Sequence, residues 1–597
     1  MTTTKRPRTF PLNALGIAVA LGLSAPAYAV NFNLGEVEGQ FDSYLSVGAS
    51  WSTQKPDHDL ISNSKPGGRG FTATGDDGRL NFDRWDTFSK IFKGVHDLEL
   101  KYRDSGVFVR GKYWYDFELK DESRLFKQIE EHNRKEGAKS SGAQILDAFV
   151  YHNYSIGDLP GTARLGRQVV SWGESTFIGN SINAINPLDV SALRRPGAEL
   201  KEGLLPVSMA YISQSLTDRL AMEAFYQLEW DQTIVDNCGT FFGNDVLQDG
   251  CTHNYHVGNP AIAPLAGIAG MYGQAIDVDA EGVVLHRAPD RDARDSGQWG
   301  LALRWLGDNA EYGAYAMNYH NRTPSVSMIA PGLATAAQIG NIIGAANSVA
   351  PGMGAGLAQS VILGKSRYYL DYVEDIRLYG LSFSTSLPTG TAWSGEISYR
   401  PNMPIQYNTA DLTRAVLNTI APGTSPISAT WGSDINGYER AEVTQLQTTA
   451  VHNFDRIMGA GRMILVGELG MTFVGGMNDG RFGRDSIYGA PEDALQLARY
   501  GWGGFYTRDS WGYRLRAIWD YSNAFAGVNL SPSISWAHDV DGYGPTFNEG
   551  TRAISLGLDA NYRNTYTASL SYTDYFGGRY NANSDRDFLA LSFGVNF

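Results

Sequence analysis

The two cysteines of this chain are the residues whose chemistry is simplest to infer. Cys238 and Cys251 lie in one segment with several glycines between them, and the chain has no third thiol. In an oxidising compartment, two thiols this close in sequence form a disulfide. His253 and His256 follow, but at a spacing that is irregular for a zinc site. We therefore predict a disulfide that closes a loop, and no metal site.

Charged residues alternate with apolar residues in several segments, which places them on one face of an extended strand. The predicted inward-facing charges are Arg110, Lys112, Asp116, Glu223, Arg514, Arg516 and Asp520. The cations among them could form a ladder that guides anions through a pore. Because both signs are abundant, we favour pairing of these cations with neighbouring carboxylates.

Signatures of catalysis are scarce. Gly-x-Ser-x-Gly, His-Glu-x-x-His and a P-loop are absent from the sequence. A membrane phospholipase with Ser and His on the lipid face of a strand is the enzyme class to consider, and no motif marks such a pair. The net charge of −14 argues against a nucleic-acid partner. We expect neither an enzyme nor a cofactor.

One long segment mixes apolar and polar residues as a constriction inside a pore would. It runs from residue 172 to residue 190 and beyond. The candidate constriction residues are Trp172, Glu174, Ser175, Asn186 and Asp189. A packed extracellular loop would have a similar composition, so both interpretations stay open.

A second long segment, residues 323–364, contains no charged residue and includes Ile339, Ile342 and Ile343. Glycine and proline interrupt it too often for a spanning helix. An apolar segment outside the membrane must be covered by other loops, the lumen wall, lipid acyl chains, a neighbouring subunit or an apolar ligand. Loop packing is the simplest explanation, and the others favour a path for a hydrophobic compound over a purely ionic pore.

Strands and their connections predict the fold class. Apolar and polar residues alternate in segments such as 107–117, 220–230, 513–521 and 554–562. Short turns and long loops follow each other along the whole chain, as in bacterial outer-membrane barrels. The sequence predicts an all-β transmembrane antiparallel barrel of about 18 strands, with short periplasmic turns and long extracellular loops.

Both ends of the chain agree with this prediction. Residues 1–29 have the cationic start, apolar run and Ala27-Tyr28-Ala29 site of a signal peptide. Residues 30–597 then form the barrel, with a plug or constriction made by loops. The final strand alternates apolar residues up to the terminal Phe597, which resembles the sorting signal read by the barrel-assembly machinery. The predicted location is the outer membrane, with lipid and lipopolysaccharide as neighbours.

Several motifs are similar to those of a family of proteobacterial outer-membrane proteins of about 600 residues, catalogued as a domain of unknown function. The motifs are Gly166–Ser175, Ile185–Asp189, Glu223–Gln227, Cys238–Phe242, Tyr379–Phe383, Gly395–Asn402 and Ser571–Gly578. Members of that family are exported barrels. They are often accompanied by a periplasmic lipoprotein-like partner and an inner-membrane exporter of the resistance-nodulation class.

This resemblance implies transport, and the apolar segment favours a hydrophobic or amphipathic small molecule. A porin for polar solutes, selective by lumen charge, is the first alternative. A surface-binding barrel that conducts nothing is the second.

Overall fold

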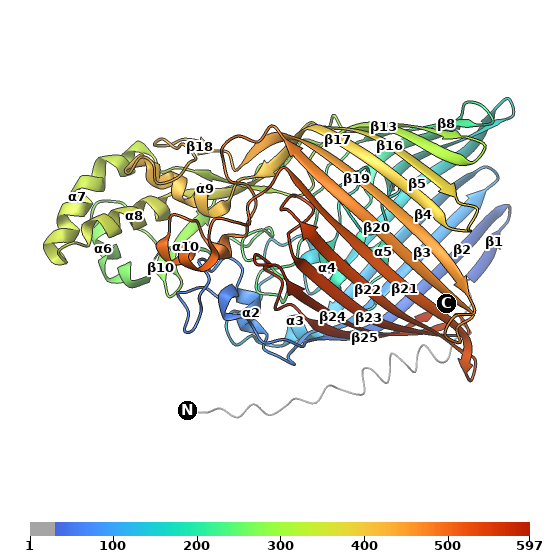
Figure 1. The fold of residues 1–597 in the computed structure, drawn as a ribbon, viewed down its shortest axis with the longest axis horizontal. Helices are drawn as coiled ribbons and strands as arrows, with labels where there is room; N and C mark the ends of the chain where they lie inside the picture. Colours follow the sequence, from blue (N-terminus) through green and yellow to red (C-terminus); the bar gives the residue numbers. More distant parts are fainter. Residues whose placement is uncertain (1–29, 259) are drawn as a thin grey trace.

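The computed structural model describes residues 30–258 and 260–597. Within these ranges, 18 antiparallel strands close into a barrel, and loops extend from one end of it (Figure 1). The prediction of fold class is therefore confirmed. The predicted signal peptide lies outside the described residues.

Each barrel strand pairs with the next one in the chain, so the barrel is a continuous meander. Its strands are β2 (Val37–Ser52), β3 (Thr87–Tyr102), β4 (Ser105–Asp116), β5 (Ser141–Ile156), β6 (Leu159–Gln168), β7 (Val207–Ser215), β8 (Leu220–Gln227), β12 (Trp299–Leu306), β13 (Ala310–Tyr319), β16 (Ile376–Ser386), β17 (Ala392–Gln406), β19 (Tyr438–Asp455), β20 (Arg462–Gly475), β21 (Asp509–Phe525), β22 (Val528–Asp541), β23 (Thr551–Tyr562), β24 (Tyr566–Gly577) and β25 (Phe588–Asn596).

The two faces of the strands differ as a barrel in lipid requires. Leu515, Leu558, Leu570 and Phe593 are 40–51% exposed on the outer face. Their neighbours in sequence, such as Arg514, point to the lumen. Alternation of period two produces this separation, because successive side chains leave opposite faces of a strand.

Closure of the barrel depends on the end of the chain. The backbone N–H of Ser43 in β2 donates to the carbonyl of Phe597 (2.6 Å), and the N–H of Phe597 donates back to Ser43 (2.9 Å). Beyond this point, the short strand β1 (Val30–Leu34) pairs with the start of β2. Thus β1 covers the part of the β2 edge that β25 does not reach.

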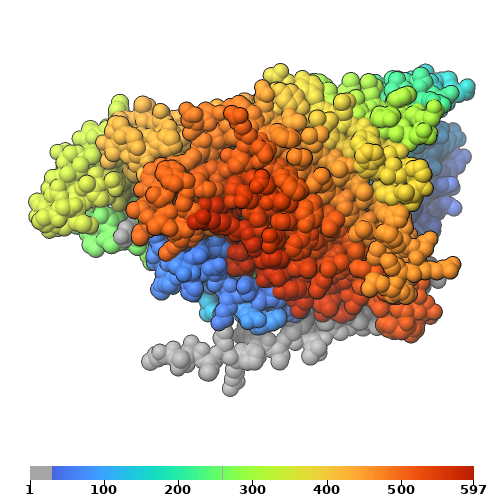
Figure 2. Space-filling model, viewed as in Figure 1, coloured from blue at the N-terminus to red at the C-terminus, as the bar shows by residue number. Residues whose placement is uncertain are grey.

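The connections alternate between short turns and long loops, as predicted. The loops contain helices η1 (His58–Leu60), α2 (Asp77–Asn81), α3 (Phe117–Asp121), η2 (Glu136–Ala138), α4 (Val190–Arg194), α5 (Leu200–Gly203), η5 (Ser486–Tyr488) and α10 (Ala494–Tyr500). Among the described helices, none is both long and apolar enough to cross a membrane. The long loops gather at the end of the barrel away from the C-terminus (Figures 1 and 2).

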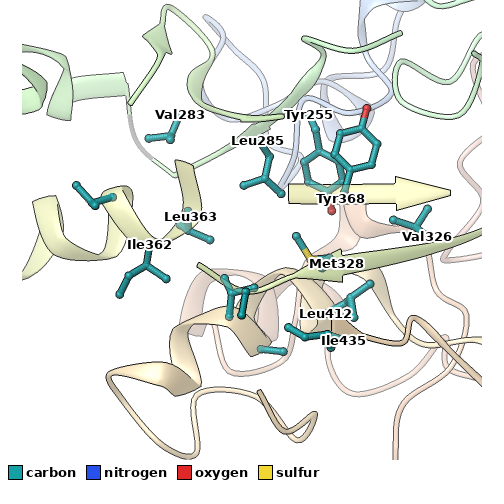
Figure 3. Close-up of a cluster of buried hydrophobic side chains, with 14 of the residues drawn as sticks. Tyr255, Val283, Leu285, Val326, Met328, Ile362, Leu363, Tyr368, Leu412 and Ile435 are labelled. Carbon is teal, nitrogen blue, oxygen red and sulfur yellow. The ribbon is translucent and has the colours of Figure 1, made fainter. Parts of the chain in front are cut away.

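Three loops, residues 228–298, 320–375 and 407–437, build a structure outside the barrel that we call the cap. Its sheet has six strands: β9 (Tyr255–Val257), β10 (Val278–Asp279), β11 (Gly282–Arg287), β14 (Ser325–Ile329), β15 (Arg367–Asp371) and β18 (Asp434–Ile435). Its helices are η3 (Pro260–Leu265), α6 (Ala266–Met271), α7 (Leu333–Val349), α8 (Gly354–Lys365), α9 (Thr409–Ala415) and η4 (Val416–Thr419). Met328, Ile362, Tyr368 and Leu412 pack in its core (Figure 3).

Candidate functional site

The loop between β6 and β7, residues 169–206, folds into the barrel, and we call it the inserted loop. Trp172 in this loop is 1% exposed and packs on Phe225 of β8 and Tyr315 of β13, with ring centroids 5.0 and 5.8 Å apart. The indole Nε1 donates to Glu223 Oε2 at 2.7 Å. These partners belong to the inner face of the wall, so the loop narrows the lumen and does not lie outside the membrane.

Two carboxylates on β17 and β20, further round the same side of the barrel, hold the middle of the inserted loop. Glu468 of β20 accepts the backbone N–H groups of Thr176, Phe177 and Ile178 at 2.6–2.9 Å. Glu396 of β17 accepts the N–H groups of Glu174 and Ile182. A charged acceptor binds backbone donors more strongly than a neutral one does. The middle of the loop is therefore held by hydrogen bonds to the barrel wall, and not only by its two ends.

An arginine completes this anchor. Arg400 of β17 is fully buried and donates to the carbonyls of Asn180 (2.9 Å) and Ser181 (2.5 Å) and to the hydroxyl of Tyr319 (2.9 Å). Glu396, Arg400 and Glu468 were not among the predicted site residues. Their signal was a charge on the lumen face of a mostly neutral strand, but that pattern does not reveal a partner.

The second half of the inserted loop is fixed to β3 and β4 by two buried ion pairs. Lys112 Nζ lies 2.8 Å from Asp189 Oδ2, with side chains 2% and 0% exposed. Lys93 Nζ lies 2.5 Å from Glu202 Oε1, with both side chains 2% exposed. The other oxygen of Asp189 accepts the N–H of Ala192 at 2.9 Å and so caps α4.

The remaining constriction candidates have structural positions within the same loop. Asn186 accepts the N–H of Val170 (3.0 Å) and donates to the carbonyl of Leu205 (2.9 Å), which joins the two stems of the loop. Ser175 is partly exposed and precedes the amides bound by Glu468. The structure thus brings Trp172, Asn186 and Asp189 into one inserted element.

The predicted lumen charges lie on the inner face, and most are paired with an opposite charge. Arg110 binds Asp97 (2.7 Å) and Asp147 (3.2 Å). The other pairs are Arg304 with Glu223 (2.9 Å), Arg514 with Asp539 (2.6 Å) and Arg462 with Asp520 (2.6 Å). Asp116 accepts the N–H groups of Glu118 and Leu119 and caps α3. Asp97 stands directly opposite Arg110, and Asp520 opposite Arg462, in the strand register, which a single strand does not reveal.

Arg516 differs from this pattern, because its Nε has no hydrogen-bond partner among the described residues. It lies on the inner face of β21, two residues from Arg514. The other predicted cations, Arg110, Lys112 and Arg514, each pair with a carboxylate. These cations therefore do not form a basic ladder along the wall.

A cavity of about 300 Å³ separates the inserted loop from the opposite side of the barrel. Its lining from the wall is Tyr44, Ser531, Asp559, Ala560, Asn561, Thr567, Ala568, Ser569, Ser592 and Asn596, and its lining from the loop is Gly197, Ala198 and Glu199. Among the described residues, no hydrogen bond or ion pair joins the inserted loop to β21, β22, β23 or β24. The loop is therefore anchored mainly on one side of the lumen; towards the other side, Asn180 Nδ2 donates to Thr546 Oγ1 in the connection between β22 and β23 at 3.3 Å.

The apolar segment packs within the cap and does not line the lumen of the barrel. Ile339 and Ile342 of α7 are 7% and 0% exposed in the core of the cap, and Ile343 packs at the edge of that core. In Figure 1, α7 stands at the far end of the cap from the barrel. A segment rich in alanine, glycine and isoleucine formed two packed helices because other loops supply the apolar surface to cover it.

The disulfide between Cys238 and Cys251 is present, as predicted, with a sequence separation of 13. It lies in the loop that follows β8. Both cysteines are buried, and the guanidinium of Arg134 lies 3.2 Å from the sulfur of Cys238.

A family model described as "Protein of unknown function (DUF1302)" matches residues 11–597. The chain belongs to this family. No curated protein matches the chain. The DUF1302 motifs singled out in the sequence concentrate at the inserted loop: Gly166–Ser175 and Ile185–Asp189 form part of it, while Glu223–Gln227 and Gly395–Asn402 contain its anchors Glu223, Glu396 and Arg400.

Three solved structures are similar to this chain over nearly its whole length, at low TM-scores. OccAB1 of Acinetobacter baumannii has 10% identity and a TM-score of 0.39, covering 96% of this DUF1302 chain and 98% of OccAB1. OpdK of Pseudomonas aeruginosa has 8% identity and a TM-score of 0.39, covering 94% and 98%. OmpF of Salmonella typhi, in a complex with daunomycin, has 9% identity and a TM-score of 0.34, covering 95% and 100%. Similarity this low carries no information about a substrate.

Proposed function

We propose that this protein is an outer-membrane channel in which the inserted loop narrows the lumen and a small hydrogen-bonding solute passes beside it. The observation that carries the proposal is the cavity between the loop and the wall formed by β22 to β25. Hydroxyl, amide and carboxylate groups dominate that cavity, including Ser531, Asn561, Ser569 and Glu199. Side chains of this kind can replace the hydrogen bonds between a hydrated solute and water, but they make no favourable contact with an apolar solute.

The anchoring of the loop supports a fixed passage. Buried ion pairs at Lys93 and Lys112 hold one half of the loop, and Glu396, Arg400 and Glu468 hold the other. Removing one member of such a buried pair is costly, so the loop does not leave the lumen readily. Solute must then pass where the loop has no polar attachment, along the inner face of β22 to β24.

Liposome swelling tests this proposal. We expect liposomes that contain the folded protein to swell in small sugars or amino acids, at rates that fall steeply with solute size. Swelling no faster than that of protein-free liposomes, in every polar solute tested, would contradict it and favour a barrel that binds at the surface without conducting.

A second candidate function is transport of a hydrophobic or amphipathic compound, together with a periplasmic lipoprotein-like partner and an inner-membrane exporter. It is favoured by the tip of the cap, where Met271, Leu333 and Val349 are 69–74% exposed and the helices carry no charge before Lys365. Replacing Leu333 and Val349 with Ser leaves the cap core intact and removes this apolar surface. Altered uptake of an apolar compound, with unchanged sugar flux, would support the second candidate over the first.

A further inference from the structure

Three aspartates from two extracellular loops meet in the interior of the molecule. Asp76 and Asp77 lie at the start of α2, and Asp245 lies in the segment closed by the disulfide. Their exposed fractions are 0%, 1% and 0%. One carboxylate oxygen of each lies within 4.8 Å of those of the other two. Like charges this close, and without water, repel each other strongly.

The protein supplies hydrogen-bond donors to only some of the carboxylate oxygens in this cluster. Asp76 Oδ2 accepts the N–H of Ser62 at 2.9 Å, and Asp245 Oδ2 accepts the N–H of Asp77 at 3.1 Å. Asp76 Oδ1 and Asp77 Oδ1 have no hydrogen-bond partner among the described residues, while Asp77 Oδ2 contacts only Lys127. Asp76 occupies the N-cap of α2, yet its side chain makes no capping hydrogen bond. An aspartate at this position ordinarily uses its carboxylate on the helix N–H groups, so the side chain of Asp76 is directed into the cluster instead.

Nearby cations compensate the charge only partly. Lys127 Nζ lies 2.7 Å from Asp77 Oδ2. Lys65 pairs with Glu281, and Arg79 pairs with Asp585 at 3.0 Å. Three carboxylates and one contacting lysine leave a formal charge of −2. Burial raises the pKa of Asp76 to about 6 and raises that of Asp245 above its usual range, as expected for carboxylates without a matching cation.

We infer that Asp76, Asp77 and Asp245 form a binding site for a divalent cation, with Ca²⁺ as the preferred ion. Calcium binds oxygen ligands at about 2.3–2.6 Å, so two ligands on opposite sides of the ion are about 5 Å apart. The separation within this cluster fits that limit. All three side chains offer oxygen only, which suits Ca²⁺ and not a metal that prefers sulfur or nitrogen.

The site would join loop 53–86 to the segment between Cys238 and Cys251. The same short helix α2 carries Arg79, which reaches Asp585 in the loop before β25. Bound Ca²⁺ would therefore fix three extracellular loops to one another. Sequence alone gives no sign of this site, because Asp245 is 168 residues from Asp77.

Isothermal titration calorimetry with CaCl₂ tests the inference. The full-length protein, purified in detergent and stripped with EDTA, is compared with D76N and D245N. D308N is the control, because Asp308 is an exposed carboxylate in a periplasmic turn, paired with Arg219 and far from this cluster. We expect one Ca²⁺ per chain, with a Kd of about 10⁻⁴–10⁻³ M or tighter, as in extracellular modules. D76N and D245N should weaken binding at least about tenfold, since each removes a charged ligand, whereas D308N should bind as the parent does.

Three results would overturn the inference. The first is a folded parent protein that binds no Ca²⁺ at millimolar concentration. The second is binding that D76N and D245N leave unchanged. The third is a D76N protein whose loops resist proteolysis better than those of the parent, when Ca²⁺ changes the proteolysis of neither protein. That result would mean that the carboxylates of the cluster are protonated and bind no cation. If D76N does not fold, judged by heat-modifiable migration, the titration of the parent and its protection from proteolysis by Ca²⁺ decide the question.

Discussion

Lys112 on β4 and Asp189 in the inserted loop form an ion pair of 2.8 Å from which water is excluded. The pair joins the barrel wall to an element 77 residues further along the chain. Lys112 Nζ also donates to the carbonyl of Glu202 at 3.0 Å, so one ammonium group holds both ends of the α4 to α5 segment.

Replacing Asp189 with Ala should release this half of the loop. The substitution leaves Lys112 buried without its counter-charge, which costs about 3–5 kcal/mol. We expect larger and noisier single-channel currents from D189A in planar bilayers. The control is the exposed ion pair between Arg219 and Asp308, which lie in two neighbouring periplasmic turns. D308A should conduct as the parent does. Parent-like currents from D189A would mean that the loop does not depend on this pair.

The inner and outer faces of the strands could be predicted from the sequence, whereas the contacts made by the long loops could not. The faces of β21 and β23 followed from alternation, because burial on one face of a strand requires period two. The position of Phe597 at the closing strand followed for the same reason. The anchors of the inserted loop did not, since Glu468 binds an amide 292 residues away. The cap was missed because its core is assembled from three loops, none of which has enough apolar surface alone.

Loss of the disulfide should loosen the cap and leave the barrel folded. The bond closes a loop with a sequence separation of 13, and a loop of this size loses about 3 kcal/mol of stabilisation on opening. We expect faster proteolysis of C238S between residues 228 and 298, with unchanged heat-modifiable migration. Thiol titration of the never-reduced parent should find no free thiol. Two free thiols in that protein would contradict the pairing.

Ile342 should matter for the stability of the cap more than its apolar neighbours at the surface. Its side chain is fully buried, so I342A should destabilise the cap by about 2–5 kcal/mol. L333A is the control on the same helix, because Leu333 is 73% exposed. Hydrogen exchange of α7 measures the difference. Equal protection in the two variants would contradict the packing described here.

Removal of Phe597 should impair assembly. The deletion eliminates both backbone hydrogen bonds to Ser43 and the apolar side chain that directly follows β25. We expect little heat-modifiable barrel in outer-membrane fractions of the deletion variant. N596A, which changes the adjacent lumen-facing residue, should assemble normally. Normal amounts of barrel from the deletion variant would show that the end of the strand is dispensable.

The central claim is that solute passes between the inserted loop and β22 to β25, and single-channel conductance of S569W and L570W tests it most directly. Ser569 faces the cavity, whereas Leu570 is 42% exposed on the outer face. The same large residue, placed one position apart on β24, enters the passage in one variant and the lipid in the other. We expect S569W to lose most of the parent conductance and L570W to keep it. Equal conductance of S569W and the parent, or a parent that conducts nothing, would contradict the claim.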